Sequence, residues 1–215
     1  MIIDIELLKS SFPLLLCGAQ VSLQIAALSC MIGLCLGTII ALLQRLNIIL
    51  LNLVIGAYVT IIRGTPMLIQ ISFWYFALGL EPFVAAVLGI GLNSGAYVSE
   101  VIRSGLAAVG KGQIEAAQVL GLSKLQTIRF ILLPQAIRTV LPALGNEFIT
   151  IIKDSSLAST IGVVELYRQA SYIRGRTYDV FTPYLAMALI YLTMTTTLSL
   201  VISYTERRLN RHVKS

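Results

Sequence analysis

Charged side chains are scarce in this sequence. Asp, Glu, Lys and Arg make up 12% of its 215 residues, whereas soluble domains carry about 25%. Apolar types make up 57%, and the mean hydropathy is +0.86. A soluble protein of this length has too much surface for its volume to bury so many apolar side chains. The composition excludes a soluble globule, a disordered chain and a basic nucleic-acid-binding protein, and it predicts a multi-span membrane protein whose net charge of +6 reflects topology.

Histidine is almost absent, and cysteine is rare. The single histidine, His212, lies in a basic tail, so we expect no histidine-based metal or catalytic centre and no intramembrane hydrolase with a serine–histidine pair. The three cysteines, Cys17, Cys30 and Cys35, share one apolar stretch without the C-x-x-C spacing of metal or redox sites. We expect them to be buried as small apolar side chains.

Long uncharged runs indicate the candidate spans, because a helix needs about 20 apolar residues to cross a bilayer. Residues 12–43 and 181–204 carry no charge, 82–102 carry only Glu100, and 139–166 contain four charged residues. The segment 46–80 is ambiguous, since Arg63 divides it into two short runs. It fits either two short spans or one span preceded by an interfacial helix, and Pro66 is suited to begin a helix.

Positive charge predicts the orientation of the C-terminal half. Lys and Arg gather in two regions, with five in 103–138 and four in 207–214, and both regions are expected to be cytoplasmic. A five-span arrangement with the N-terminus outside and a six-span arrangement with the N-terminus inside both place eleven basic residues inside and four outside. Charge alone therefore leaves the N-terminal half open.

The stretch 104–138 predicts a helix–turn–helix outside the bilayer. Residues 113–120 fit a short helix that Gly121 ends, and Ser123 is a good N-cap for a second helix. Such a unit suits docking on a partner protein. A pattern close to a phosphate-binding loop at 105–112 has Gly112 where Ser or Thr is needed and follows a span instead of a strand, so we expect no ATP site in this chain.

The same stretch carries Glu115-Ala116-Ala117, then Gly121, Ile131 and Leu133-Pro134 at fixed spacings. This pattern resembles the EAA motif of binding-protein-dependent ABC transporter permeases. Five further segments are similar to the polar amino-acid branch of that family, at 63–66, 94–97, 111–113, 146–149 and 153–157. The resemblance covers nearly the whole chain.

The resemblance implies an all-α integral membrane protein with the type I ABC importer permease fold. That fold has five transmembrane helices, an outside N-terminus and a cytoplasmic C-terminus, with one span across roughly 60–80. It implies one permease domain, 1–215, in the cell inner membrane, with a cytoplasmic coupling region at about 104–138. The implied partners are two ATPase subunits that bind ATP-Mg, a second permease subunit (another copy or a sibling chain), and an extracytoplasmic amino-acid-binding protein. The chain itself would need no cofactor and catalyse no reaction.

The resemblance also assigns ATPase coupling to residues of the EAA segment. Small side chains there allow close approach of a partner, Glu115 offers an anchor for a basic partner residue, and Gly121 lets the chain turn sharply. The coupling residues are Lys111, Glu115, Ala116, Ala117, Leu120 and Gly121.

Polar residues within the spans are the candidates for substrate contact, because polar groups are costly in a membrane. Those candidates are Gln20, Gln24, Asn93, Ser94, Tyr97, Glu100, Asp154, Ser155 and Ser156. Several have alternative roles. Gln20 and Gln24 share one helix face, which points either to the pore or to a partner helix. Glu100 also suits an ion pair with Arg103, and Asp154 suits an ion pair with its neighbour Lys153. The segment 153–156 either unwinds near the midplane or stays helical.

The acidic residues favour a basic substrate. Glu100, Glu147 and Asp154 suit an ammonium group or a cationic side chain, whereas serine hydroxyls suit a carboxylate. We therefore expect import of polar amino acids, with a preference for a basic one such as arginine. The alternative is a stand-alone ion-coupled amino-acid carrier in which Glu100 or Asp154 holds the ion, although it leaves the helices at 113–130 unexplained.

Overall fold

The computed structural model describes residues 3–210, with the side chains at 111, 209 and 210 outside the description. The predictions about His212 and the end of the basic tail fall outside the described residues. The described part is built from helices, in the order α1 (Ile5–Gln44), α2 (Ile49–Gly64), α3 (Met67–Ser72), η1 (Phe73–Ala77), α4 (Pro82–Ala107), α5 (Lys111–Val119), α6 (Lys124–Thr127), η2 (Ile128–Leu132), α7 (Leu133–Asp154), η3 (Ser155–Ile161), α8 (Leu166–Thr177) and α9 (Phe181–Asn210).

Among the described residues, four helical segments are long and apolar enough to cross a membrane: α1, α4, α9, and the continuous helix that contains α7. The fifth candidate span is the pair formed by α2 and α3–η1, which bends by 105° at its break. The five-span prediction is therefore confirmed with this pair counted as one span. The pair begins at Ile49, earlier than the expected start near residue 60, because the segment before the break is itself a regular helix. This earlier start places Arg63, which the charge count took as cytoplasmic, within the span.

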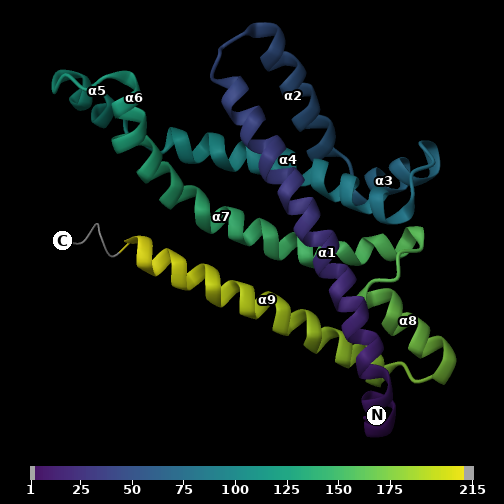
Figure 1. The fold of residues 1–215 in the computed structure, drawn as a ribbon. Coiled ribbons are helices and arrows are strands. Elements are labelled where there is room, and N and C mark those ends of the chain that lie inside the picture. Colours follow the sequence, from purple (N-terminus) through teal and green to yellow (C-terminus); the bar gives the residue numbers. More distant parts are fainter. Residues whose placement is uncertain (1–2, 211–215) are drawn as a thin grey trace.

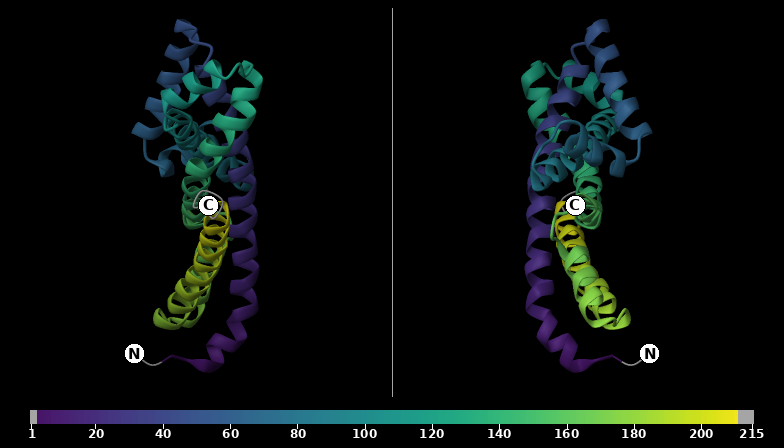
Figure 2. Two further views of the ribbon diagram at one scale, coloured as in Figure 1. Left: turned by 90° about the vertical axis from the view of Figure 1, so that its left-hand side faces the viewer. Right: turned by 90° about the vertical axis from the view of Figure 1, so that its right-hand side faces the viewer.

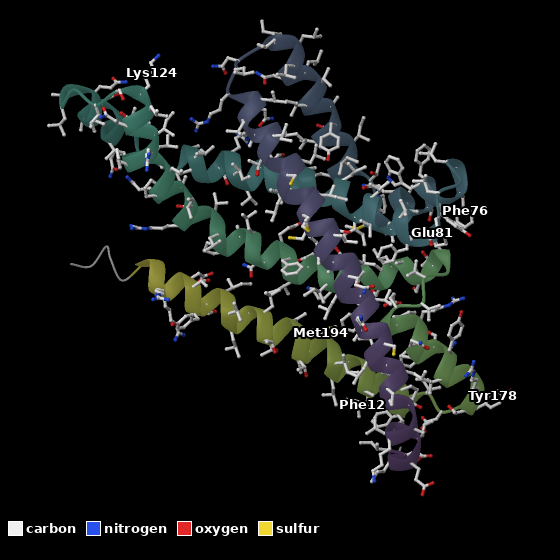
Figure 3. All side chains as sticks on the ribbon, in the orientation of Figure 1. Phe12, Phe76, Glu81, Lys124, Tyr178 and Met194 are labelled. Atoms are coloured by element: carbon white, nitrogen blue, oxygen red, sulfur yellow. The ribbon has the colours of Figure 1, made fainter. Side chains whose placement is uncertain are left out.

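The arrangement agrees with the predicted topology. In Figure 1, α5, α6 and the C-terminal end of α9 lie on the left, whereas the N-terminus and α8 lie at the lower right. Lys124 and Tyr178, labelled in Figure 3, lie toward these two ends of the molecule. The basic segments expected in the cytoplasm are thus on one side, as the positive-inside rule requires.

The long helix α1 packs closely against α4 through glycines. A Cβ atom added to Gly37 would lie 2.5 Å from Val98 Cγ1, and one added to Gly33 would lie 2.6 Å from Ser94 Oγ. Small residues let helix backbones approach closely in a membrane, and the contact fixes the rotation of α4 about its axis. This rotation decides which side chains of α4 face the candidate site.

The main core cluster joins α1, α3, α4 and α7. Ile25, Ile71, Ile90 and Ile151 lie at its centre and are at most 1% exposed. Figure 2 shows α1 extending from the N-terminus at the bottom of the molecule toward its top. Helix α9 packs on α7, α1 and α8, and partly buried side chains of α9, among them Tyr191, pack against this cluster.

The expectation that all three cysteines are buried is wrong. Cys17 and Cys35 are exposed on the outer surface of α1, and Cys30 is half-buried. In a membrane, lipid tails are as apolar as a protein core, so a small apolar side chain gains little from burial in protein.

Candidate translocation site

A polar cleft lies between α4, α7 and the break that separates α2 from α3. Its volume is about 490 Å³. The wall combines two carboxylates with amide, hydroxyl and apolar groups. The lining residues are Thr65, Pro66, Met67, Ile90, Asn93, Ser94, Tyr97, Glu147, Thr150, Ile151 and Asp154. Four of the predicted substrate residues, Asn93, Ser94, Tyr97 and Asp154, are brought together here.

A network of amides ties α4 to the break. Asn93 Nδ2 donates to Gln70 Oε1 at 3.1 Å, and Gln70 Nε2 donates to the backbone oxygens of Ile62 at 2.7 Å and Thr65 at 3.0 Å. Both amide side chains are buried. Gln70 thus satisfies two carbonyls that the bend releases from helical bonding, which removes the cost of leaving them unpaired. Gln70 could not be singled out from the sequence, because it is one polar residue within an apolar run.

Ser94 presents a buried hydroxyl at the cleft. The residue is 2% exposed, and its Oγ makes no hydrogen bond of good geometry to the described residues, although the carboxylate of Glu147 lies close enough to interact with it. The close contact with Gly33 of α1 holds Ser94 in place. A buried hydroxyl without a partner is unusual in a folded protein and suits a ligand group that completes its bonding.

The acidic wall comes from one face of α7. Glu147, Thr150 and Asp154 are spaced so that they stack on the same side of a helix. No cation lies within ion-pair distance of Glu147 or Asp154 among the described residues. The suggested ion pair between Asp154 and Lys153 is therefore not formed, and both carboxylates remain available to a ligand.

The segment after Asp154 tightens instead of unwinding. Residues 155–161 form the 3₁₀ helix η3, which ends at Gly162 with φ of 94°. The hydroxyls of Ser155 and Ser156 donate to the carbonyls of Ile152 and Lys153, each at 2.7 Å. Neither serine lines the cleft. A serine in a helix can bond its own preceding carbonyls, and sequence does not show which partner it takes.

Three other predicted residues lie away from the cleft. Gln20 and Gln24 are exposed on the outer face of α1, and Gln20 lines an apolar groove of about 550 Å³ between α1 and α9. Phe12 and Met194, labelled in Figure 3, belong to the walls of this groove. Glu100 is paired with Arg103, with 2.6 Å between Oε2 and Nη2, so the ion-pair alternative holds for Glu100.

The coupling region forms the expected helix–turn–helix. Helix α5 begins at Lys111, whose side chain lies outside the described part, and ends at Val119. Gly121 turns the chain with φ of 77°, and Ser123 caps α6 in a capping box with Gln126. The region projects from the left of the bundle in Figure 1.

Most of the predicted coupling residues are exposed on α5 or just beyond its C-terminal end. Glu115 and Ala116 are exposed, and Leu120 is 80% exposed, whereas Ala117 is buried. Such an apolar leucine at the tip of a solvent-facing unit is typical of a surface that is covered in a complex. The glycines of the phosphate-loop-like pattern do not form a phosphate loop, because Gly105 lies within α4 and packs against Val140.

A buried carboxylate that the sequence did not assign joins α1, α8 and α9. Glu165 is fully buried and caps α8, accepting from the backbone N–H groups of Tyr167 and Arg168 at 2.8 Å each. It also accepts from the Tyr191 hydroxyl at 3.1 Å and from the Ser22 hydroxyl at 3.4 Å. Burial raises the pKa of Glu165, and these hydrogen bonds partly oppose the rise.

Comparison with known proteins identifies relatives across almost the whole chain. Residues 33–211 match the family described as binding-protein-dependent transport system inner membrane component. The glutamine transport system permease protein GlnP of Escherichia coli (strain K12) is 40% identical over 211 residues, covering 95% of this chain and 94% of the relative. The L-cystine transport system permease protein TcyB of Bacillus subtilis (strain 168) is 40% identical over 215 residues, covering 97% and 92%.

Solved structures share the fold. The crystal structure of an amino acid ABC transporter with histidines is 41% identical, with a TM-score of 0.91, and the match covers 97% of this chain and 100% of that chain. An inward-facing structure of the MetNI methionine ABC transporter is 20% identical, with a TM-score of 0.76, and the match covers 92% and 96%. At that identity the second comparison shows a common fold and nothing more.

Proposed function

Because the chain belongs to the family of binding-protein-dependent transport system inner membrane components, we propose that its cleft carries polar amino acids across the membrane, with a preference for a basic one such as arginine. At the coarser level the protein is the permease subunit of an ABC importer for amino acids. ATP hydrolysis, under this proposal, is performed by a separate subunit.

The single observation that carries the proposal is the pair of carboxylates in the cleft. Glu147 and Asp154 share a wall with Asn93 and Ser94 and have no cation of the described chain within ion-pair distance. Charged groups at membrane depth are rare and are retained where they serve a pathway. Two carboxylates suit the ammonium of any amino acid, and they leave a second anion for a cationic side chain. The solved relative described with histidines also supports a basic side chain.

The coupling unit supports a separate ATPase. We propose that the exposed face of α5, with Glu115, Ala116 and Leu120, docks on an ATPase subunit that binds ATP-Mg, while Ala117 packs inward and Lys111 and Gly121 delimit the unit. The complete importer would hold two such ATPases, a second permease subunit (another copy or a sibling) and an extracytoplasmic binding protein. Within the described chain, no packing contact of the helix–turn–helix accounts for the exposure of Leu120, whereas docking on a partner would cover it.

The proposal is tested by substrate-dependent ATPase activity. The permease is co-purified with the ATPase encoded beside it and reconstituted into liposomes with the cognate binding protein. Arginine, histidine, glutamine and cystine are then compared. We expect stimulation by arginine that falls at least about tenfold in Asp154→Asn, and no loss in the exposed control Glu6→Gln. Stimulation by glutamine or cystine alone would reject the basic preference, and the absence of any ATPase partner would favour the ion-coupled carrier.

The coupling role has its own matched pair of variants. Gly121→Ala forces a side chain into a left-handed conformation, which costs about 1 kcal/mol and turns the exposed tip of α5. Gly110→Ala meets no neighbour within 4 Å and has an ordinary φ. We expect loss of stimulated ATPase activity only in Gly121→Ala, with the spans still folded as judged by thermal unfolding. Unchanged stimulation in Gly121→Ala would reject the coupling role of this turn.

A further inference from the structure

Arg63 is a charged residue at membrane depth that forms no ion pair among the described residues, although Glu100 lies in its vicinity. It lies about 21 Å along α2 from Ile49, just before the break. The single ion pair among the described residues joins Glu100 to Arg103, and Glu100 uses both of its carboxylate oxygens there. Arg63 is also exposed in the isolated chain. A guanidinium at this depth must face a polar cavity or another charged group, because lipid solvates it poorly.

The guanidinium of Arg63 lies at the edge of the cleft. Its carbon Cζ is 5.1 Å from the centre of the Tyr97 ring, and Tyr97 is one of the lining residues. Tyr97 lies about 15 Å from the cytoplasmic end of α4. This distance is a second, independent indication that the contact between Arg63 and Tyr97 lies well inside the membrane. Stacking on a ring uses the flat face of a guanidinium and leaves the N–H groups in its plane available to an anion.

The position of Arg63 is fixed by the break. Thr65 and Pro66, the residues just beyond it, line the cleft. Gln70 holds this segment through the carbonyls of Ile62 and Thr65, on either side of Arg63. A residue placed between two anchored carbonyls has a backbone that cannot move freely, so its side chain is presented to the cleft from a constant direction.

The residues that line the cleft can bind the ammonium group of an amino acid, but they include no cationic side chain to bind its carboxylate. The walls of the cleft carry two carboxylates together with amide and hydroxyl groups. A free amino acid is a zwitterion, and its carboxylate is best held by a guanidinium that donates two parallel hydrogen bonds. Building on the proposed function, we propose that Arg63 binds the α-carboxylate of the substrate while Glu147 and Asp154 face its ammonium and its cationic side chain. The substrate is then oriented with its carboxylate toward Arg63 and Tyr97.

The consequence is selectivity for zwitterions. A compound with the same side chain and ammonium but without the carboxylate leaves Arg63 unpaired at membrane depth and places an excess of positive charge in the cleft. Such a compound should bind weakly even if its side chain fits. Arg63 would thus distinguish amino acids from amines, while the acidic wall distinguishes among side chains.

The test measures binding to the permease–ATPase complex in lipid nanodiscs without the binding protein, which would otherwise select the ligand first. Radiolabelled arginine is displaced by unlabelled arginine or by argininamide, at about pH 6, where both α-amino groups are protonated. The pair glutamine and glutaminamide is measured in the same way. We expect the wild-type complex to prefer each acid over its amide by at least about tenfold.

Variants separate Arg63 from other basic residues. Arg63→Gln should reduce the preference for acid over amide to within about twofold, whereas Arg63→Lys should keep part of it because the charge remains. The control is Arg45→Gln, at the cytoplasmic end of α1, which should keep the full preference. Elution as a single species and an unchanged unfolding temperature establish that each variant is folded.

Each outcome decides one claim. Equal binding of acid and amide by the wild type overturns the inference without any variant, and so does a full preference retained in Arg63→Gln. Either result leaves the cleft as the site of permeation. If the wild-type complex binds neither arginine nor glutamine, the proposed function of the cleft fails together with the inference. If Arg63→Gln does not assemble, Arg63→Lys and the wild-type comparison still decide the matter.

Discussion

Two acidic regions of this molecule differ in burial and in hydrogen bonding. Glu165 is fully buried, accepts from two backbone N–H groups and two hydroxyls, and joins three helices. Glu147 and Asp154 are half-buried and face a cleft, without a cation of the described chain within ion-pair distance. A buried carboxylate whose bonds are all supplied by the protein stabilises the fold, whereas one whose bonds are left open is available to a ligand. Burial alone therefore does not identify a functional acid, and the set of partners does.

The largest expected effect is on transport, from a change in the cleft. Glu147→Gln removes one of the two negative charges without changing the shape of the side chain. We expect uptake of arginine into liposomes to fall at least about tenfold, because the ammonium and the cationic side chain then compete for a single carboxylate. The unfolding temperature should stay the same or rise, since a partly buried charge is removed. A large loss of stability with normal uptake would show that Glu147, like Glu165, stabilises the fold and does not bind the substrate.

The next effect is on stability, from the other side of the comparison. Glu165→Ala leaves the N-terminus of α8 without its cap and leaves the Ser22 and Tyr191 hydroxyls without their acceptor. We expect a loss of about 2 kcal/mol in the free energy of unfolding. Uptake per folded molecule should change little, because Glu165 lies outside the cleft. Thermal unfolding in nanodiscs measures the first quantity, and uptake normalised to folded protein measures the second.

The smallest effect is the pH dependence of that stability. Burial raises the pKa of Glu165 above its unfolded value, so the folded state binds the proton more tightly than the unfolded state. The stabilisation is then fully present below the unfolded pKa of about 4.3 and is lost as pH rises through the folded value. We expect the unfolding temperature to fall over this window on raising the pH. The dependence should be weaker in Glu165→Gln, and equal slopes in the two proteins would contradict this account.

The sequence predicted part of the site through helical spacing. Asn93, Ser94 and Tyr97 follow from polar positions in one span, and Asp154 follows from the rule on intramembrane charge. Spacing shows that two side chains share a face, but it does not show where the face points. Gln20 and Gln24 illustrate this limit, since they share a face of α1 that lies away from the cleft.

The rest of the site required the fold. Asn93 and Gln70 are 23 residues apart and meet only because the second span bends. The same bend sets the start of that span and brings Arg63 to Tyr97. Five spans followed from the family resemblance, because charge counts alone fitted six as well. The amide of Gln70 that stabilises the break is itself held by Asn93 of another helix, and the sequence shows no local pattern for this beyond Pro66, so the geometry of the break was not predictable.

The bend has a further consequence for hydration. At a break in a membrane helix the released carbonyls are often satisfied by water or by neighbouring helices. Here the amide of Gln70 satisfies those of Ile62 and Thr65. The bend therefore does not depend on water in the cleft, and it persists whether the cleft is wet, dry or filled. The shape of the site is in this way independent of its contents, so a change of access requires movement of whole helices instead of refolding of one span.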